Sequence, residues 1–251
     1  MNFFKSVFAT VVGIFLFMLL SFFLLIGLGA LLGSGEDKVK LKDNSVIQLD
    51  LAKINFDYAG KYESDSPFSS LMMSKDKVGF IEVLKAIDAA KTDDKIKGIT
   101  IVNNQSGLGL AQSKELRDKL EDFKKSKKFV MAYANIYSQK EYYISSIADQ
   151  VYLNPAGEVD FKGLGTEMLF FKNFQDQTGL KMEIIRHGKF KSAVEPYLAQ
   201  EISPENREQV TVLLQSVWKT IVTDIAKNRN ISVAQLNTIA DGLLARTPQM
   251  A

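Results

Sequence analysis

The chain has 251 residues and a mass of 28.0 kDa, and 46% of its residues are hydrophobic, enough for one domain of ordinary size plus a further element. Lys and Arg number 31 against 29 Asp and Glu, so the formal net charge of +2 argues against nucleic acid as a partner. Cysteine is absent and His187 is the single histidine, which excludes disulfides, thiolate catalysis, zinc–thiolate sites and a Ser-His-Asp triad.

The N-terminal segment contains no charged residue between Lys5 and Glu36. At about 1.5 Å per residue, about 20 apolar residues in a helix cross a hydrocarbon core of about 30 Å. A cleaved signal peptide is the alternative, but its apolar region has only about 7 to 15 residues, and no A-x-A-like site follows here in a polar context. Residues 1–35 are therefore predicted to form a transmembrane anchor, and residues 36–251 a separate domain.

Charge gives only a weak indication of topology. Lys5 lies on one flank of the apolar segment, and Lys38, Lys40 and Lys42 lie on the other. This count leans toward a cytoplasmic position for the C-terminal domain.

Short apolar runs alternate with amphipathic ones from residue 46 onward, as in βα units. The predicted strands are residues 46–55, 96–104, 128–135, 150–155 (ended by Pro155) and 181–186. The predicted helices before residue 200 are 78–93, 113–125, 137–149 and 167–177, and the predicted loops include 58–75 and 157–165. Because strand, turn and helix recur at close intervals, we expect an α/β fold with a largely parallel sheet covered on both faces.

Two further helices are predicted after Pro204. The first covers residues 205–229 and has acidic residues near its start, and the second is capped by Ser232 and ended by Gly242. The sequence then stops at "LLARTPQMA", without a terminal strand or a polar tail. This ending is interpreted as a cut within a domain.

The stretch "RHGKFKSAVEPYL", residues 186–198, places Lys189 and Lys191 on either side of Phe190. A lysine is a base only as the neutral amine, and burial can lower a lysine pKa by several units from about 10.4. Serine–lysine dyads use this effect, because the amine takes the proton from a serine hydroxyl. The alternative is that both lysines are surface residues whose stems cover apolar area. Spacing alone does not decide between the two.

The block "GKFKSAVEPYL" resembles the signature around the catalytic lysine of the signal peptide peptidase A (protease IV) family, which is close to G-x-[YF]-K-S-A-x-E-P-[YF]. The segment 137–165 also resembles the helix, strand and glycine loop around the nucleophile of that family. The resemblance implies a membrane-bound serine endopeptidase with a Ser-Lys dyad on a crotonase-like (ClpP-like) fold. Lys191 matches the general base, and no cofactor is expected.

The nucleophile of the family is missing from this sequence. The family pattern around the serine is close to A-S-G-G-Y-[YW]-[IL]-S, and aligning its aromatic pair on Tyr142 and Tyr143 puts Gln139 where the serine should be. Ser138, one place earlier, is predicted to be a helix-capping or surface serine, because one residue turns a helical side chain by about 100°. Ser192 points away from Lys191 for the same reason.

In the long form of the family, a first copy of the fold supplies the lysine, and a second copy supplies the serine and the oxyanion hole. This chain resembles the anchor plus the first copy, and we expect it to be inactive alone. The segment "NNQSGLG", residues 103–109, departs from the S-P-G-G pattern of a working oxyanion loop. Lys191 is expected to lie in an apolar pocket, with its serine supplied by another domain of the same protomer or of a neighbour.

Several other residues keep two interpretations. Asn103, Asn104, Gly107 and Gly109 are either an oxyanion remnant or simply a βα turn, and Gly163 and Gly165 carry the same ambiguity. His187 either tunes the lysine or is structural. Glu195 either pairs with a lysine or positions a loop.

Two other functions remain open. A crotonase-type acyl-CoA enzyme shares the fold, and a non-catalytic scaffold would explain the missing nucleophile. The family resemblance implies hydrophobic peptide substrates such as cleaved signal peptides, homo-oligomerisation, and a single-pass location in the bacterial inner (cytoplasmic) membrane. It places the soluble domain on the extracytoplasmic side, against the lysine count.

Overall fold

The computed structural model describes residues 2–33, 41–58, 78–103, 105–185, 187–188 and 191–250. Its internal contacts divide the chain into two units, Met1–Lys42 and Asp43–Ala251. The predicted loop at 58–75 lies almost wholly outside the described residues, as do Lys38 and Lys40.

The first unit is a single helix, α1 (Asn2–Gly33). Its stretch Phe3–Leu28 has a mean hydropathy of 2.9 and none of its hydropathy window is buried by protein. By length and composition alone, this helix is able to cross a membrane.

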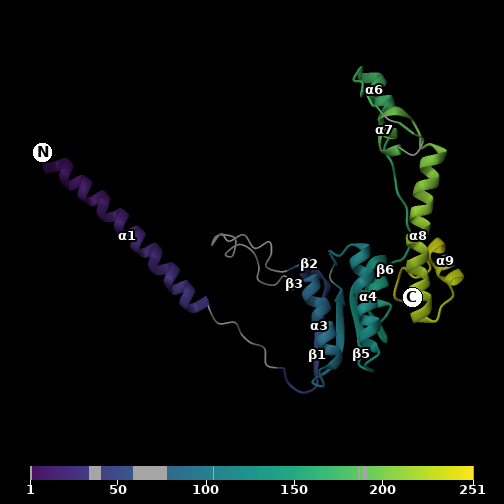
Figure 1. The fold of residues 1–251 in the computed structure, drawn as a ribbon, viewed down its shortest axis with the longest axis horizontal. Coiled ribbons are helices and arrows are strands. Elements are labelled where there is room, and N and C mark those ends of the chain that lie inside the picture. The colour runs from purple at the N-terminus through teal and green to yellow at the C-terminus, as the bar shows by residue number, and fades with distance from the viewer. Residues whose placement is uncertain are drawn as a thin grey trace. The chain divides into compact units, whose positions relative to one another are not determined.

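The second unit contains a parallel four-stranded sheet in the order β1-β4-β5-β6 (Figure 1). The strands are β1 (Ser45–Asp50), β4 (Ile96–Asn103), β5 (Phe129–Ser138) and β6 (Gln150–Asp160). A short 3-10 turn, Leu51–Lys53, follows β1, and the strands β2 (Ile54–Phe56) and β3 (Val78–Gly79) form a separate parallel pair. The predicted α/β class with a parallel sheet is confirmed.

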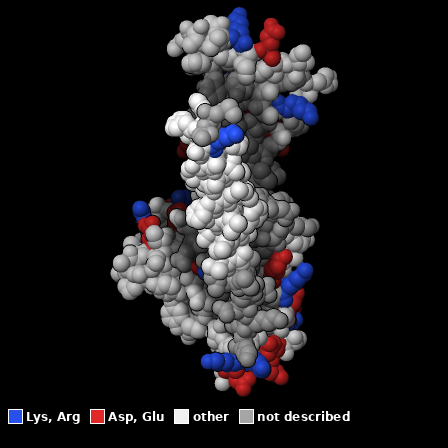
Figure 2. Space-filling view, turned by 90° about the vertical axis from the view of Figure 1, so that its left-hand side faces the viewer, with Lys and Arg blue, Asp and Glu red and all other residues white. Residues whose placement is uncertain are grey.

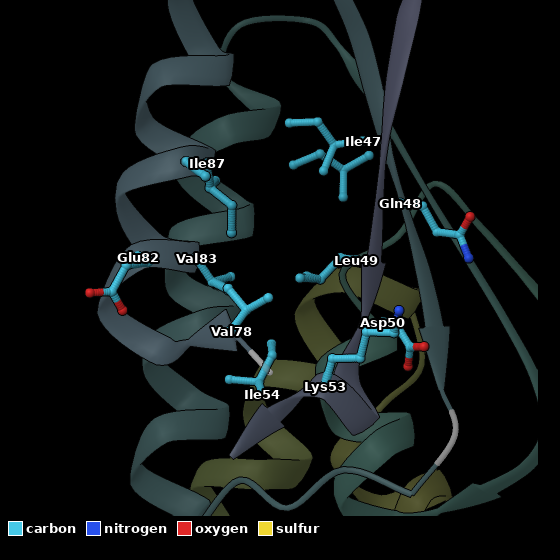
Figure 3. Close-up of a pocket in the computed structure, with 12 residues that line it drawn as sticks. Ile47, Gln48, Leu49, Asp50, Lys53, Ile54, Val78, Glu82, Val83 and Ile87 are labelled. Atoms are coloured by element: carbon cyan, nitrogen blue, oxygen red, sulfur yellow. The ribbon is translucent and has the colours of Figure 1, made fainter. Parts of the chain in front are cut away.

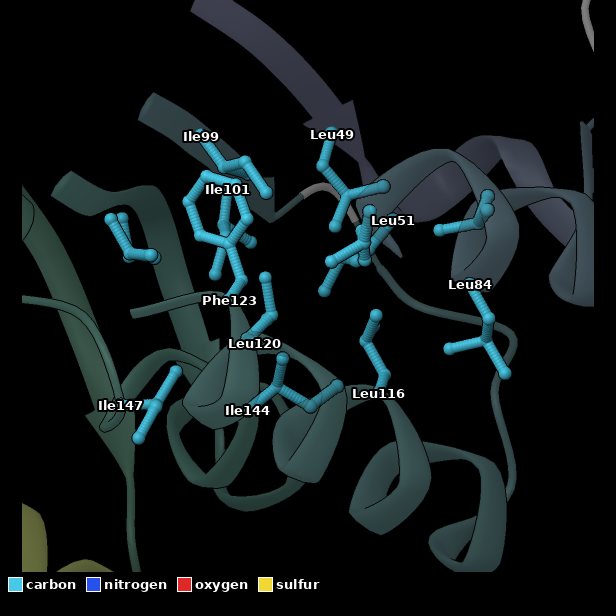
Figure 4. Packing of buried hydrophobic residues seen from close by; sticks show 14 of the residues in the cluster. Leu49, Leu51, Leu84, Ile99, Ile101, Leu116, Leu120, Phe123, Ile144 and Ile147 are labelled. Carbon is cyan, nitrogen blue, oxygen red and sulfur yellow. The ribbon is translucent and has the colours of Figure 1, made fainter. Parts of the chain in front are cut away.

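Three helices cover one face of this sheet: α3 (Phe80–Thr92), α4 (Leu110–Lys124) and α5 (Gln139–Ser145). Their apolar residues recur at spacings of three and four, so one side of each helix is apolar. Figure 4 shows the resulting core, in which α4 and α5 side chains meet those of β1 and β4. Its fully buried members include Leu51, Ile99, Leu116, Phe123 and Ile144.

The opposite face of the sheet is partly open in the described part of the chain. Val46, Phe129, Tyr133 and Tyr152 are 45%, 36%, 41% and 46% exposed, and the strand register places them on one side. The expectation that both faces are covered is therefore wrong for the described residues. Its premise was that parallel sheets are normally buried on both sides.

Strand β6 runs through Pro155, so the prediction that this proline ends the strand is wrong. β6 is the edge strand, where a missing N–H leaves no ladder bond unmade. The pairing of β5 with β6 is interrupted between Ala134 and Ile136, and the β6 residues from Asn154 to Gly157 lie opposite this break. The strand resumes until Asp160, so the predicted loop at 157–165 begins later than expected.

A second core joins the sheet to α8 (Pro204–Arg229) and α9 (Val233–Gly242), which both lie close to their predicted positions. Ser232 caps α9 as predicted, because its side chain accepts from the N–H of Gln235. The buried guanidinium of Arg117 joins three helices. It donates to Tyr143 O at 3.2 Å and Asp224 O at 2.8 Å, and lies 5.1 Å from the Tyr143 ring centroid.

The remainder of the second unit, which we call the arm (residues 166–217), extends from the sheet at the N-terminal end of α8 (Figure 1). It carries α6 (Lys172–Thr178), the 3-10 turn η2 (Ser192–Val194) and α7 (Glu195–Leu198). The predicted helix at 167–177 begins only at Lys172. The predicted strand at 181–186 is wrong, since residues 181–185 have no regular structure and Ile185 is fully exposed.

Candidate active site

Lys191 lies on the arm, directly before η2 and α7, and is exposed. Gly188 precedes it with φ +96°, a backbone angle that favours glycine. His187 is also exposed, and Lys189 and Phe190 lie outside the described residues. The motif is therefore a turn at the protein surface. The apolar pocket predicted around Lys191 is not formed by the described part of this chain.

Glu195 lies in the same turn and, unlike Lys191, is buried, with 4% of its surface exposed. Its carboxylate accepts hydrogen bonds from Ser203 and from Asn206, which is itself 4% exposed. These contacts fit the loop-positioning role, one of the two roles left open by the sequence. The sequence analysis did not single out Asn206, which lies in the first turn of a helix and belongs to no motif.

Gln139, which the sequence analysis aligns with the family nucleophile, is held by backbone contacts. Its Oε1 accepts from the N–H groups of Lys162, at 3.2 Å, and Gly163, at 2.9 Å, and its Nε2 donates to Gly163 O at 3.1 Å. Gly163 has φ +85°, so it is a turn glycine. An amide in this arrangement joins the start of α5 to the segment after β6, and it is not a nucleophile.

Ser138 is the N-cap of α5, as predicted. Its hydroxyl accepts from Glu141 N at 3.3 Å, and Glu141 Oε2 accepts from Ser138 N at 3.0 Å, which completes a capping box. The serine therefore has a structural role in the described chain. Ser192 begins η2 on the arm.

The loop after β4 is closed by side chains at the positions where an oxyanion hole would need free N–H groups. Ser106 N donates to Glu141 Oε1 at 2.7 Å, Leu108 N to Ser106 Oγ at 3.2 Å, and Gly109 N to Gln112 Oε1 at 2.9 Å. These contacts favour the turn interpretation of the loop over an oxyanion remnant.

Asn103, just before this loop, is 3% exposed and donates to Ser145 Oγ at 2.7 Å. Its Oδ1 finds no hydrogen-bond partner among the described residues. Asn104 lies outside them.

The structure does not bring Lys191 together with Gln139 or Ser138. The Lys191 turn attaches to the N-cap of α8 through Ser203, whereas α5 contacts α8 near its other end, where Tyr143 donates to Asp224 Oδ2 at 2.6 Å. At a rise of 1.5 Å per residue, about 30 Å of helix separates Ser203 from Asp224. Figure 1 shows α7 at the outer end of α8. A lysine side chain does not span this separation.

A pocket of about 430 Å³ lies elsewhere, at the β1 edge of the sheet, between β1 and α3 (Figure 3). Ile47 and Leu49 point into it, and Gln48 and Asp50 point away. Its lining is mainly aliphatic, and of its charged members Asp50, Lys53 and Glu82 none belongs to the lysine motif. The pocket is separate from the candidate site.

Charged side chains of both signs lie near one another on the face shown in Figure 2, without a field of one sign. This distribution agrees with the small net charge and gives no support for a nucleic-acid surface.

Comparison with known proteins gives the same assignment as the lysine motif. The model of peptidase family S49 matches residues 122–247, half of the chain. The chain belongs to peptidase family S49. The matched region contains both Lys191 and Gln139, and the resemblance inferred from the motif is confirmed at the level of the family.

Individual relatives are similar over half of the chain or more. Protease 4 of Haemophilus influenzae is 38% identical over 156 residues, covering 62% of this chain and 25% of its own length. Protease 4 of Salmonella typhi is 34% identical over 167 residues, covering 64% and 27%. The chloroplastic serine protease SPPA of Arabidopsis thaliana is 30% identical over 129 residues, covering 51% and 19%. The matched part of the chain thus spans between 19% and 27% of the length of these three relatives.

One solved structure, a crystal structure in the enoyl-CoA hydratase/isomerase group from Acinetobacter baumannii, covers 68% of this chain and 84% of its own. Its TM-score is 0.26 and its sequence identity 13%. A likeness of this degree supports no argument about function.

Proposed function

We propose that this chain is the lysine-bearing part of a membrane-anchored serine endopeptidase that degrades cleaved signal peptides and other hydrophobic peptides. Lys191 is the general base, and the nucleophilic serine belongs to a second protease domain. The observation that carries the proposal is the separation of Lys191 from α5, in a chain of peptidase family S49 whose own nucleophile position holds Gln139.

The contacts within the chain support a split site. A serine protease needs a serine, a base and free N–H donors for the oxyanion within one site. Here the serine position is an amide bonded to Gly163, and the N–H groups of Ser106, Leu108 and Gly109 already have acceptors. The lysine is presented at the surface, where another domain can reach it. The chain alone is therefore expected to be inactive.

The chemistry assigned to Lys191 requires its neutral amine. In the acylation step, the serine hydroxyl gives its proton to the amine while its oxygen attacks the peptide carbonyl. The resulting ammonium then gives the proton to the leaving amine, and an acyl-enzyme remains. In the second step, the lysine takes a proton from water as the water oxygen attacks the acyl group. The ester bond to the serine then breaks, the ammonium returns the proton to the serine oxygen, and the carboxylic acid product leaves. Covering Lys191 with a second domain would withdraw the amine from water and so favour the neutral form.

The arm has an apolar surface suited to such a partner. Seven of its described large apolar residues are more than half exposed: Leu169, Phe174, Leu180, Met182, Ile185, Val212 and Leu213. They lie on the arm, which also carries Lys191, and large exposed apolar patches usually mark interaction sites. The proposed partner is the serine-bearing domain, in the same protomer or in a neighbouring subunit of a homo-oligomer.

Helix α1 is the proposed anchor, which would hold the site beside the bilayer where apolar peptides are concentrated. We place the chain in the bacterial inner membrane with one span. The soluble unit is placed on the extracytoplasmic side, because the family resemblance outweighs the weak lysine count around α1.

The experiment compares peptidase activity on an apolar reporter peptide among four samples: this chain, the full-length gene product, and its variants Lys191→Ala and Lys181→Ala. Lys181 is the matched control, an exposed lysine of the same arm. The proposal predicts an inactive chain, an active full-length protein, loss of activity in Lys191→Ala at unchanged oligomer size, and normal activity in Lys181→Ala. Full activity of Lys191→Ala would instead make this domain a scaffold, and cleavage by the chain alone would place the nucleophile within it.

A further inference from the structure

The turn that carries Lys191 is fastened to α8 through the buried carboxylate of Glu195. Oε1 accepts from Ser203 Oγ at 2.5 Å, and Oε2 accepts from Asn206 Nδ2 at 2.9 Å and Ser203 N at 3.3 Å. All of these partners are donors, and a carboxylate is the side chain that accepts at both of its atoms. The negative charge also lies at the N-terminus of a 26-residue helix, where the helix dipole stabilises it.

Ser203 makes this contact part of the helix itself. It is the N-cap of α8, and its hydroxyl also accepts from Asn206 N at 3.2 Å. The carboxylate of Glu195 therefore links the N-cap of α8 to the segment that carries Lys191. This segment and the first helical turn of α8 share one hydrogen-bond network.

The other side of the same turn is held by α6. Pro196 O accepts from Phe171 N at 2.6 Å, and Tyr197 O accepts from Gln175 Nε2 at 2.8 Å. The rings of Phe171 and Tyr197 stack with their centroids 5.6 Å apart. Contacts on two sides fix the position of α7.

Lys191 is connected to α7 by the single 3-10 turn η2. Glu195 N–H donates to Ser192 O, which closes η2 immediately after Lys191. The backbone of the exposed lysine is thus set by contacts that are partly or, between Glu195 and Asn206, fully buried. An exposed base that must meet a serine on another domain needs a fixed backbone position, since a misplacement of about 1 Å can cost about 100-fold in rate.

We propose that Glu195 is a positioning residue for Lys191: through Ser203 and Asn206 it holds the turn from which Lys191 meets the serine. This inference rests on the proposed function of Lys191. Gln175 makes the second attachment of the turn, on the α6 side.

The first test uses the full-length gene product with the variants Glu195→Ala, Glu195→Gln and Asp149→Asn. Asp149 is the control, because it too is a carboxylate that accepts a backbone N–H, from Val130 at 2.8 Å, but at the far end of the sheet. Glu195→Ala is expected to lower kcat about 100-fold with KM changed less than twofold. Glu195→Gln is expected to recover most of this loss, because its oxygen can serve Asn206 and Ser203 N while the Ser203 hydroxyl accepts from the new amide.

Asp149→Asn is expected to lower stability without lowering kcat per folded molecule. The inference is overturned if Glu195→Ala keeps kcat within about threefold of the wild type. It is also overturned if the loss follows only the folded fraction, as it would for Asp149→Asn, or if Glu195→Gln is as inactive as Glu195→Ala.

The second test is independent of catalysis and uses this chain. Hydrogen–deuterium exchange in peptides covering residues 195–206 is expected to be faster in Glu195→Ala, because Ser203 N loses its acceptor, while exchange in α4 stays the same. Unchanged exchange at 195–206 would refute the attachment. If Lys191→Ala retains activity while this exchange does increase, the proposed function fails and the attachment itself stands.

Discussion

The side-chain amide of Gln139 and the backbone of Gly163 bond to each other in both directions, with Oε1 accepting at 2.9 Å and Nε2 donating at 3.1 Å. This pair joins the first turn of α5 to the left-handed turn after β6. The Gln139 side chain is thus a structural clamp, with its amide oxygen and its amide nitrogen both hydrogen-bonded.

Restoring the motif at this position is expected to damage the chain without creating a protease. Gln139→Ser removes both bonds to Gly163, and a serine is too short to replace them. We expect a loss of about 1–3 kcal/mol in the free energy of unfolding, measured with urea. The variant should not react with a fluorophosphonate probe, because the proposed base Lys191 lies on the arm, away from α5. Labelling of the Gln139→Ser variant at the substituted position would show that a base is present near α5.

Replacement by alanine should cost very different amounts of folding stability at two glycines of the strands. A Cβ on Gly157 would lie 2.0 Å from Asn135 O, a backbone atom of the paired strand, so the sheet itself must move. A Cβ on Gly98 would lie 2.5 Å from the ring of Phe129, which is 36% exposed and can turn toward solvent. We expect Gly157→Ala to cost about 2 kcal/mol or more and Gly98→Ala less than about 1 kcal/mol. Equal losses of stability in urea denaturation would contradict this description of the β5–β6 break.

Asp149 should make the stability of the fold depend on pH. Burial by itself raises the pKa of this carboxyl, but hydrogen bonds from Lys124 and Val130 N–H outweigh it and hold the pKa below its usual value of about 3.9. A lowered folded-state pKa adds stability that is fully present above the unfolded-state pKa and disappears as pH falls through the folded-state pKa. Asp149→Asn should therefore lower Tm at pH 7, and the difference from wild type should shrink below about pH 4.

The control for this measurement is Asp241→Asn, at an exposed position near the end of α9, which should leave Tm unchanged. A Tm difference for Asp149→Asn that stays constant from pH 7 to pH 3 would contradict the assignment.

The apolar surface of the arm should be needed for assembly and not for folding. Phe174 is 57% exposed, so Phe174→Asp is expected to leave the Tm of this chain within a few degrees of wild type. In the full-length gene product the same change should weaken docking and lower peptidase activity at least about tenfold. Leu110→Asp, at an exposed position 43% accessible at the start of α4, is the matched control and should preserve activity. Equal activity of Phe174→Asp and Leu110→Asp would argue against the arm as the docking surface.

Local patterns in the sequence are sufficient to predict the positions of helices and strands that bury one face. Helices α3, α8 and α9 were located closely because apolar spacing and capping residues such as Ser232 act within one turn of the chain. The strands of the sheet were also located, although β6 passes Pro155. Whether proline ends a strand depends on whether the strand lies at an edge, which is a property of the whole sheet.

The arm was the part that sequence patterns described poorly. The run at 181–186 contains Met182, Ile184 and Ile185 and was predicted to be a strand, but strands are stabilised by pairing, and the described residues 181–185 have no partner strand. Apolar residues in this run predict burial against a partner. The same pattern is expected whether the partner is the chain's own core or another domain.

The candidate site was predictable only in its chemistry. The motif identified the family and predicted Lys191 as the base and a serine supplied from elsewhere, because residue identity alone carries that information. The attachment of Glu195 to Asn206 and the clamp between Gln139 and Gly163 join residues from separate elements, so they became visible only in the fold.

The most direct test of the account is to react the full-length gene product and its Lys191→Ala variant with a fluorophosphonate probe at pH 7 and to locate the labelled serine by mass spectrometry. We expect a single labelled serine outside residues 1–251, and a labelling rate at least about 100-fold lower in Lys191→Ala. Label on Ser138 or Ser192, or a rate that does not depend on Lys191, would contradict a dyad divided between two domains.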